Sequence, residues 1–277
     1  MSIVVSVRVN DGIVLAADSA TSFFDPNTGN VVKVYNSANK IFNLVKGCPI
    51  GVMTYGSGSI GSASISTLSK DFRSRLSSGD AAGYLLQRTS YTIEEVAQKA
   101  KNFFFEEHFR KEYPQGVPHY FLGYRICGYS SDGTLPEGWE IKIIENRCEG
   151  PERFYEESLF GPRWAGETEA LDRLVLGVGS KCAEALTQMG LTQEVARQTM
   201  SQLINRLYAP LFLPAMPIQD AIDLAWFLAD TAARFTQFSL RAATVGGPIE
   251  VATITKHEGF KWVTRKHYYS AELNRET

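Results

Sequence analysis

The stretch SIVVSVRVNDGIVLAADS, residues 2–19, decides the fold that the rest of the sequence builds on. Residues 2–9 and 12–19 are two runs rich in β-branched side chains, which favour extended backbone. A short polar turn separates the two runs, and its dipeptide Asp11-Gly12 is a strong signal for a tight hairpin. The sequence therefore predicts a β-hairpin at the start of the chain.

The rest of the chain predicts strands in runs and helices in pairs. Apolar spacing and turn signals indicate strands at 39–45, 49–55, 119–129, 139–146 and 248–255, and helices at 60–76, 92–113, 192–207 and 218–238. The polar segment 24–30 is expected to be a loop, so four strands would precede the first helix. This order lacks the strict alternation of strand and helix that a parallel sheet requires. We therefore expect an α+β fold, a four-layer αββα sandwich of two antiparallel sheets, formed by one domain over residues 1–277.

Composition excludes several classes of protein. The chain has 277 residues, 44% of them hydrophobic, and a net charge of −2, so its field favours neither nucleic acid nor an anionic membrane surface. Its cysteine and histidine residues lie at no metal-ligand spacing, and no apolar stretch is long enough to span a bilayer. We expect a cytoplasmic protein with no metal and no cofactor.

A glycine-rich turn offers one alternative. Gly56, Gly58 and Gly61 in YGSGSIG match the G-x-G-x-x-G pattern of dinucleotide-binding loops. That pattern needs a strand–helix–strand unit whose second strand ends in an acidic residue, and no apolar strand follows at the required distance. Nucleotide binding through these glycines therefore stays as a less favoured alternative.

Ser2 offers a different chemistry. If Met1 is removed, Ser2 carries both a hydroxyl and an α-amine that titrates at about 7.7–8.0, so one residue supplies nucleophile and base. A nearby cation would lower the pKa of the amine, and a carboxylate would hold the cation. Lys40 and Asp18 are suitably placed if the first four strands form one sheet. Taken singly, Asp18 is better explained as a strand-end cap and Lys40 as a surface lysine.

Three segments together resemble the proteasome β-subunit family of N-terminal nucleophile hydrolases: SIVVSVRVNDGIVLAADSATS at 2–22, NKIF at 39–42 and GVMTYGSGSIG at 51–61. The similarity is greatest to the bacterial branch that includes HslV and the ancestral β-subunit-like (Anbu-like) proteins. It implies a bacterial proteasome-like peptidase or amidohydrolase with Ser2 at the position of the nucleophile, which is usually threonine. By the same resemblance Asp18 is the carboxylate, Lys40 the lysine, and the backbone N–H of Gly56 the oxyanion hole.

Other segments depart from the catalytic members of that family. Ala242 and Val245 stand where polar groups help to hold the nucleophile's amine, and Ala20 stands where an arginine is expected. These departures leave open a catalytically weak or inactive scaffold subunit as the alternative. Glu167 or Thr244 would compensate under a further hypothesis, although surface or capping roles are more common for such residues.

The resemblance also implies partners. It predicts a homo-oligomer, either a ring or an open ring and helical stack, that acts on a peptide or small amide; whether an ATP-dependent unfoldase feeds it is unknown. The chain is longer than the family pattern in the loop 23–35 and in a helical segment at about 175–217. Extra amphipathic helix in such a family lines a subunit contact or simply covers its own sheet, and the two alternatives have equal weight.

Overall fold

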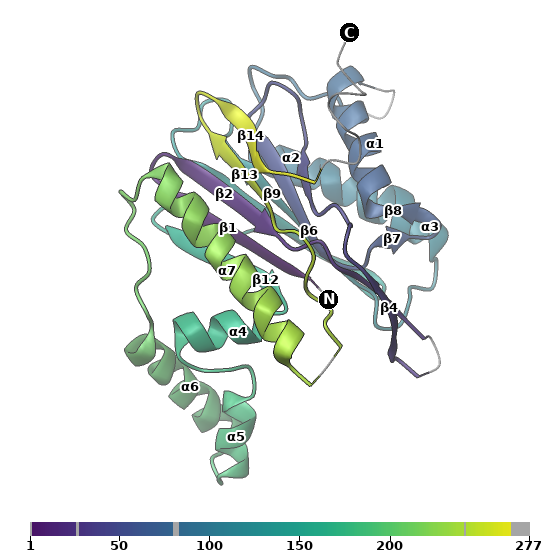
Figure 1. The fold of residues 1–277 in the computed structure, drawn as a ribbon. Helices are drawn as coiled ribbons and strands as arrows, with labels where there is room; N and C mark the ends of the chain where they lie inside the picture. The colour runs from purple at the N-terminus through teal and green to yellow at the C-terminus, as the bar shows by residue number, and fades with distance from the viewer. Residues whose placement is uncertain (1, 26–27, 80–82, 241, 267–277) are drawn as a thin grey trace.

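The computed structural model describes residues 2–25, 28–79, 83–240 and 242–266 of the chain. Two five-stranded sheets form its centre and face each other. Figure 1 shows helix α7 (Ile218–Phe238) across the outside of one sheet, with α1 (Ile65–Ser78) and α2 (Ile93–Lys101) beside the other. The expected α+β fold with two antiparallel sheets is confirmed.

The first sheet has the strand order β12-β1-β2-β13-β14, and every neighbouring pair is antiparallel. Its strands are β1 (Ile3–Val9), β2 (Gly12–Ala17), β12 (Gly161–Gly166), β13 (Glu250–Thr255) and β14 (Gly259–Thr264). Val9 pairs with Gly12 across a two-residue turn, so the predicted opening hairpin is confirmed. Both of its strands are buried over their whole length, which explains why they carry nearly continuous apolar runs.

The second sheet has the order β11-β10-β9-β6-β5 and is also antiparallel throughout. Its strands are β5 (Ile41–Asn43), β6 (Ile50–Gly56), β9 (Phe121–Gly128), β10 (Glu137–Ile144) and β11 (Arg147–Arg153). The first four predicted strands therefore do not form one sheet, which was the condition stated for placing Asp18 and Lys40 together. The opening hairpin belongs to the first sheet and β5 and β6 to the second, because hydrophobic side chains on β1, β2, β5 and β6 bury one another across the gap between the sheets.

Alternation along β1 separates two of the hydrophobic clusters. Val4 points into the cluster between the sheets, whereas Ile3 and Val5 pack in the cluster beneath α7, as the two-residue period of a strand requires. The α7 side of that outer cluster is made largely of alanines, which let the helix lie close to the sheet: Ala221, Ala225, Ala229 and Ala232.

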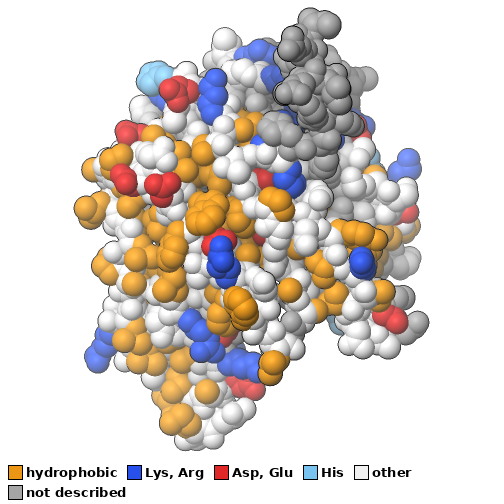
Figure 2. All heavy atoms as spheres, viewed as in Figure 1, with side chains coloured by type: hydrophobic (Ala, Val, Ile, Leu, Met, Phe, Trp, Pro, Cys, Tyr) orange, Lys and Arg blue, Asp and Glu red, His pale blue; other side chains and the backbone are white. Residues whose placement is uncertain are grey.

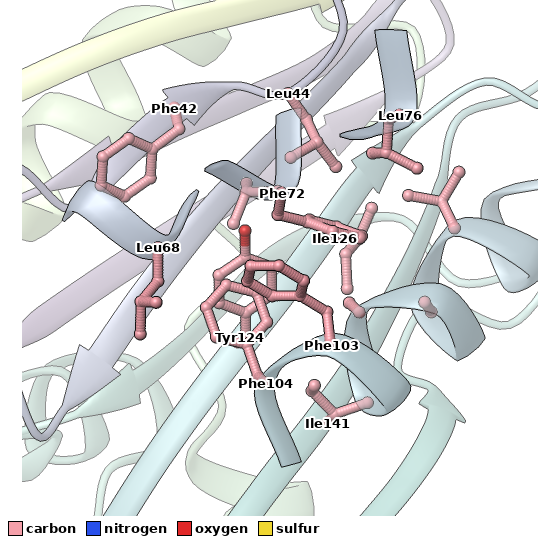
Figure 3. Close-up of a cluster of buried hydrophobic side chains, with 14 of the residues drawn as sticks. Phe42, Leu44, Leu68, Phe72, Leu76, Phe103, Phe104, Tyr124, Ile126 and Ile141 are labelled. Carbon is pink, nitrogen blue, oxygen red and sulfur yellow. The ribbon is translucent and has the colours of Figure 1, made fainter. Parts of the chain in front are cut away.

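A third hydrophobic cluster lies under the helices of the second sheet. Figure 3 shows Phe72 of α1 among Phe103, Phe104 and Tyr124, with the ring centroids of Phe72 and Phe103 5.2 Å apart. The two phenylalanines come from the π-helical turn η1 (Asn102–Phe109), which continues α2 and is followed by α3 (Arg110–Glu112). The predicted cap of α2 is confirmed, because the Thr92 side chain accepts a hydrogen bond from the backbone N–H of Glu95.

Several short elements were not predicted. The segment around the expected polar loop forms a hairpin of β3 (Thr21–Phe24) and β4 (Val31–Tyr35). A second small hairpin, β7 (Ser59–Ile60) and β8 (Ala63–Ser64), precedes α1, so this helix begins at residue 65 rather than 60. Strands β11, β12 and β14 were also missed, because their sequences mix polar and apolar residues without a clear two-residue period.

The segment 175–217 is helical over much of its length. It contains α5 (Cys182–Gln188) and α6 (Gln193–Leu207), after the short α4 (Glu169–Leu171) and π-helical η2 (Asp172–Leu176). Helices α6 and α7 lie within one residue of their predicted bounds. Only Ala196 of α6 is buried, so this helix covers little of the sheet core. No helix in the described part of the chain has the length and hydropathy needed to cross a bilayer.

Candidate active site

The candidate site lies where β1 begins and β2 ends. Ser2 immediately precedes β1 and is 4% exposed, and its carbonyl accepts a hydrogen bond of 2.8 Å from the backbone N–H of Glu167. Ile3 pairs with Gly166, where φ is +100° and an added Cβ would collide with the Ser2 carbonyl oxygen. Glycine at 166 therefore allows β12 to close over the backbone of Ser2.

The Asp18 carboxylate is the centre of this region. Its Oδ1 accepts the backbone N–H of Ile3 at 2.9 Å and the ammonium of Lys40 at 2.5 Å. Its Oδ2 accepts the backbone N–H groups of Ala20 and Gly246, each at 3.0 Å. Asp18 is fully buried, so these donors replace the water that a carboxylate would otherwise need. The strand-end capping expected of Asp18 is real, but it is combined with an ion pair.

Lys40 immediately precedes β5, and its ion pair with Asp18 joins the two sheets. Its exposure is 5%, so the surface-lysine alternative is wrong. Burial lowers the pKa of Lys40 below the ordinary lysine value, and the charge and hydrogen bond of Asp18 act in the opposite direction. Asp18 Oδ1 thus links the Lys40 ammonium to the backbone N–H of Ile3, the residue that follows Ser2.

Gly56 ends β6 with φ at +92°, a conformation that favours glycine. An added Cβ would also collide with the carbonyl oxygen of Phe121 on the neighbouring strand. The strand that carries Gly56 is tied to the ion pair, because the backbone N–H of Thr54 donates to the carbonyl of Lys40 at 2.9 Å. Glycine is therefore required at this position by the backbone itself, whatever chemistry its amide performs.

The structure does not supply the context that a nucleotide site needs. Both neighbours of β6 are antiparallel to it, so no strand–helix–strand unit surrounds the glycine-rich turn. The backbone N–H of Gly61 donates to the hydroxyl of Tyr113 at 2.9 Å, and the carboxylate of Glu112 lies beside Gly61. An occupied amide and a neighbouring negative charge both oppose phosphate binding at this turn.

Ala242 and Val245, which stand where the resemblance predicts polar groups, do not lie as such groups would. Val245 is buried in the hydrophobic cluster beneath α7, and Ala242 is exposed. Thr244 is buried, and its hydroxyl has no hydrogen-bond partner among the described residues. Sequence reasoning missed Gly246, which contributes through its backbone N–H and so leaves no side-chain signal.

A second buried ion pair beside the site was also missed. Lys266 lies 2.9 Å from the carboxylate of Glu250, and its ammonium also donates to the hydroxyl of Ser19, the residue after Asp18. The described residues contain no group of three or more histidine, cysteine, aspartate or glutamate side chains able to hold a metal ion.

Comparison with known proteins identifies the fold. No family model and no curated protein matches the sequence. Among solved structures, the chain is similar to a subunit of the helical assembly of the Anbu complex from Pseudomonas aeruginosa, with a TM-score of 0.52 and 14% sequence identity. The similarity covers 98% of this chain and 90% of that chain. The chain thus shares its fold with this Anbu subunit.

Proposed function

We propose that the chain is a subunit of a bacterial proteasome-like N-terminal nucleophile hydrolase, with the four-layer αββα sandwich of that class, which cleaves an amide bond through Ser2 after removal of Met1. The observation that carries this proposal is the buried Asp18–Lys40 ion pair, anchored on the backbone amide next to Ser2. A buried ion pair contributes little net stability compared with a well-packed apolar pair. Its presence next to the backbone of Ser2 is therefore better explained by chemistry than by folding.

The proposed reaction is acyl transfer. The α-amine of Ser2 takes the proton of its own hydroxyl, directly or through a water, while the hydroxyl oxygen attacks the amide carbon. The backbone N–H of Gly56 donates to the oxyanion that develops, and the C–N bond then breaks as the leaving amine takes up the proton. Water next attacks the resulting ester of Ser2, which releases the carboxylic acid and regenerates the hydroxyl.

Lys40 supplies electrostatic support in this scheme. A positive charge near the α-amine disfavours the protonated amine, so a larger fraction is the free base near neutral pH. Asp18 keeps the Lys40 ammonium in place through a contact of 2.5 Å. The substrate class that fits this chemistry is a peptide or another small amide.

The second candidate is a self-assembling scaffold that keeps the fold without efficient catalysis. It is favoured by the inward, apolar placement of Val245 and by the exposure of Ala242, which leave the amine of Ser2 without the family's polar helpers. In the catalytic proposal two residues would replace the missing polar groups. They are Glu167, whose backbone N–H donates to the Ser2 carbonyl, and Thr244, whose hydroxyl has no hydrogen-bond partner among the described residues.

Both candidate functions include assembly of several copies of this chain, either as a closed ring or as an open ring and helical stack. Figure 2 shows hydrophobic side chains gathered on the face that α7 occupies in Figure 1. Phe227, Phe235 and Phe238 of α7 are 45%, 45% and 81% exposed, which is unusual for an isolated subunit. The similar Anbu chain forms a helical assembly, and a second copy of this chain is the partner we propose for the exposed face of α7.

Intact mass and covalent trapping test the function together. We expect the native protein to lack Met1 and to gain the mass of a hydroxyl-reactive peptide electrophile on Ser2. Lys40→Ala should abolish labelling while Lys46→Ala, at an exposed lysine a few residues further along, should leave it unchanged. Loss of Met1 without labelling or turnover supports the scaffold, and complete retention of Met1 overturns the proposed base.

A further inference from the structure

Lys266 forms a second buried ion pair directly behind the proposed site. It follows β14, and its ammonium lies 2.9 Å from Oε2 of Glu250, the first residue of β13. The side chains of Lys266 and Glu250 are 9% and 2% exposed. The backbone N–H of Lys266 also donates to Oε1 of Glu250 at 3.2 Å. Lys266 therefore contacts both carboxylate oxygens of Glu250, one through its ammonium and one through its backbone.

The same ammonium connects the two segments that carry the Asp18–Lys40 pair. It donates to Oγ of Ser19 at 2.6 Å, one residue after Asp18. It also donates to the carbonyl of Ala38 at 2.8 Å, two residues before Lys40. The backbone N–H of Ala38 donates in turn to the carbonyl of Ser19 at 2.9 Å, so the two segments are joined by direct contacts as well as through Lys266.

We propose that Lys266 is a positioning residue of the hydrolase site, which holds Asp18 and Lys40 in register through Ser19 and Ala38, with Glu250 as its counterion. This inference rests on the proposed function, and it adds a charged residue from the end of the described chain to the Asp18–Lys40 pair near its beginning. Glu250 pairs with Ala17 across β13 and β2, which places the counterion beside the end of the strand that leads into Asp18.

The charge of Lys266 also acts on Lys40. Three charged groups act on Lys40 from the elements around it: Asp18 at the end of β2, Glu250 on β13 and Lys266 after β14. Besides burial, the like charge of Lys266 lowers the pKa of Lys40, whereas the carboxylates of Asp18 and Glu250 raise it. Replacing Lys266 by a neutral residue therefore raises the pKa of Lys40, and replacing Glu250 by a neutral residue lowers it.

Because Lys40 must be charged to support the reaction, its deprotonation produces the alkaline limb of the pH profile of kcat. In Lys266→Gln we expect kcat to fall at least about tenfold, with KM within about twofold, because misplacing a catalytic group lowers turnover more than binding. The alkaline limb should move to higher pH in Lys266→Gln and to lower pH in Glu250→Gln. Lys266→Arg should recover most of kcat, because it restores the charge.

Hydrogen exchange gives a readout that does not depend on activity. In Lys266→Gln the backbone amides of residues 18–20 and 38–40 should exchange faster than in the wild type, whereas Lys261→Gln, at an exposed position of β14, should change neither segment. If the wild type has no turnover, the proposed function fails and the exchange result alone decides whether Lys266 positions the two segments. If Lys266→Gln does not fold, the variant Lys266→Gln/Glu250→Gln, which removes both buried charges, takes its place.

The inference is overturned if Lys266→Gln matches Lys261→Gln in exchange at both segments. In an active wild type it is also overturned if kcat falls while the alkaline limb stays where it was, because a purely structural loss lowers the rate at every pH. Opposite movements of the limb in the Lys266 and Glu250 variants support it.

Discussion

Replacing Asp18 by asparagine removes one carboxylate charge and leaves the shape of the side chain nearly unchanged. In the native protein this carboxylate is fully buried and accepts hydrogen bonds from four donors, including the Lys40 ammonium at 2.5 Å. Asparagine leaves that ammonium buried without a counterion bonded to it, and its NH₂ group faces donors that need an acceptor. Breaking a buried pair from one side costs about 3–5 kcal/mol, so the free energy of unfolding should fall by that amount near neutral pH.

The loss should depend on pH in a direction that the structure determines. Lys40 already has a lowered pKa, and removing Asp18, which raises it, lowers it further in the variant. An unfolded lysine titrates at about 10.4, so between the lowered pKa of folded Lys40 and that value the unfolded chain binds more protons than the folded one, and stability rises with pH in that range. The difference in the free energy of unfolding between variant and wild type is therefore largest where Lys40 is charged in both proteins. It shrinks as pH rises toward the wild-type pKa of Lys40.

Removing Lys40, the other partner of the ion pair, should lower the free energy of unfolding by less. In Lys40→Met the Asp18 carboxylate keeps three backbone N–H donors, so the expected loss is about 2 kcal/mol, the contribution of a hydrogen bond to a charged group. The double variant Asp18→Asn/Lys40→Met should be more stable than Asp18→Asn alone, because it buries no unpaired charge.

Urea unfolding of the four proteins at about pH 6 and about pH 10 measures these differences. Protein concentration is held constant, because self-assembly would make the midpoint depend on it. Asp132→Asn, at an exposed turn position, is the matched control and should be neutral at both pH values. A loss below about 1 kcal/mol in Asp18→Asn, or a loss that is the same at both pH values, would refute the electrostatic account of this site.

Three further predictions concern the core, the glycine turn and the assembly. Phe72→Ala should lower the free energy of unfolding by about 3–5 kcal/mol in the same urea assay, because the fully buried ring fills the cluster of Figure 3. Gly56→Ala should lower the free energy of unfolding by at least about 2 kcal/mol, because φ is +92° and the added Cβ would collide with Phe121. Gly246→Ala should leave it nearly unchanged, because the space around an added Cβ is open. Phe238→Ser should shift sedimentation velocity toward the monomer, and an unchanged distribution would remove this position from the proposed subunit contact.

Much of the local structure was predictable because it depends on neighbouring residues. A turn dipeptide indicated the opening hairpin, and a capping side chain indicated the start of α2 at Thr92. A helical period indicated the bounds of α7. The small hairpin of β3 and β4 escaped prediction, because its strands surround a segment rich in turn residues and much of the hairpin stays exposed. Such a strand has no buried face to impose a clear period.

The residues of the candidate site were only partly accessible from the sequence. Asp18 and Lys40 were named from their places beside expected strands and from the family resemblance, and the structure brings them into contact. Their mode of contact was not predictable, since the strand before Asp18 and the strand after Lys40 lie in different sheets. Gly246 and Lys266 had no local signal, because the first acts through its backbone and the second through contacts with Ser19 and Ala38, more than two hundred residues earlier.

By itself the sequence determined the opening hairpin, the two long helices α6 and α7 and the apolar faces of the predicted elements, because these follow from propensity and period within a few residues. Only the tertiary structure decided that the opening hairpin and β5–β6 face each other in different sheets, and that two lysines and two carboxylates meet at their ends. The physical reason is that a charge can be buried only where donors and counterions from several elements replace its water. Those elements meet only when the two sheets pack.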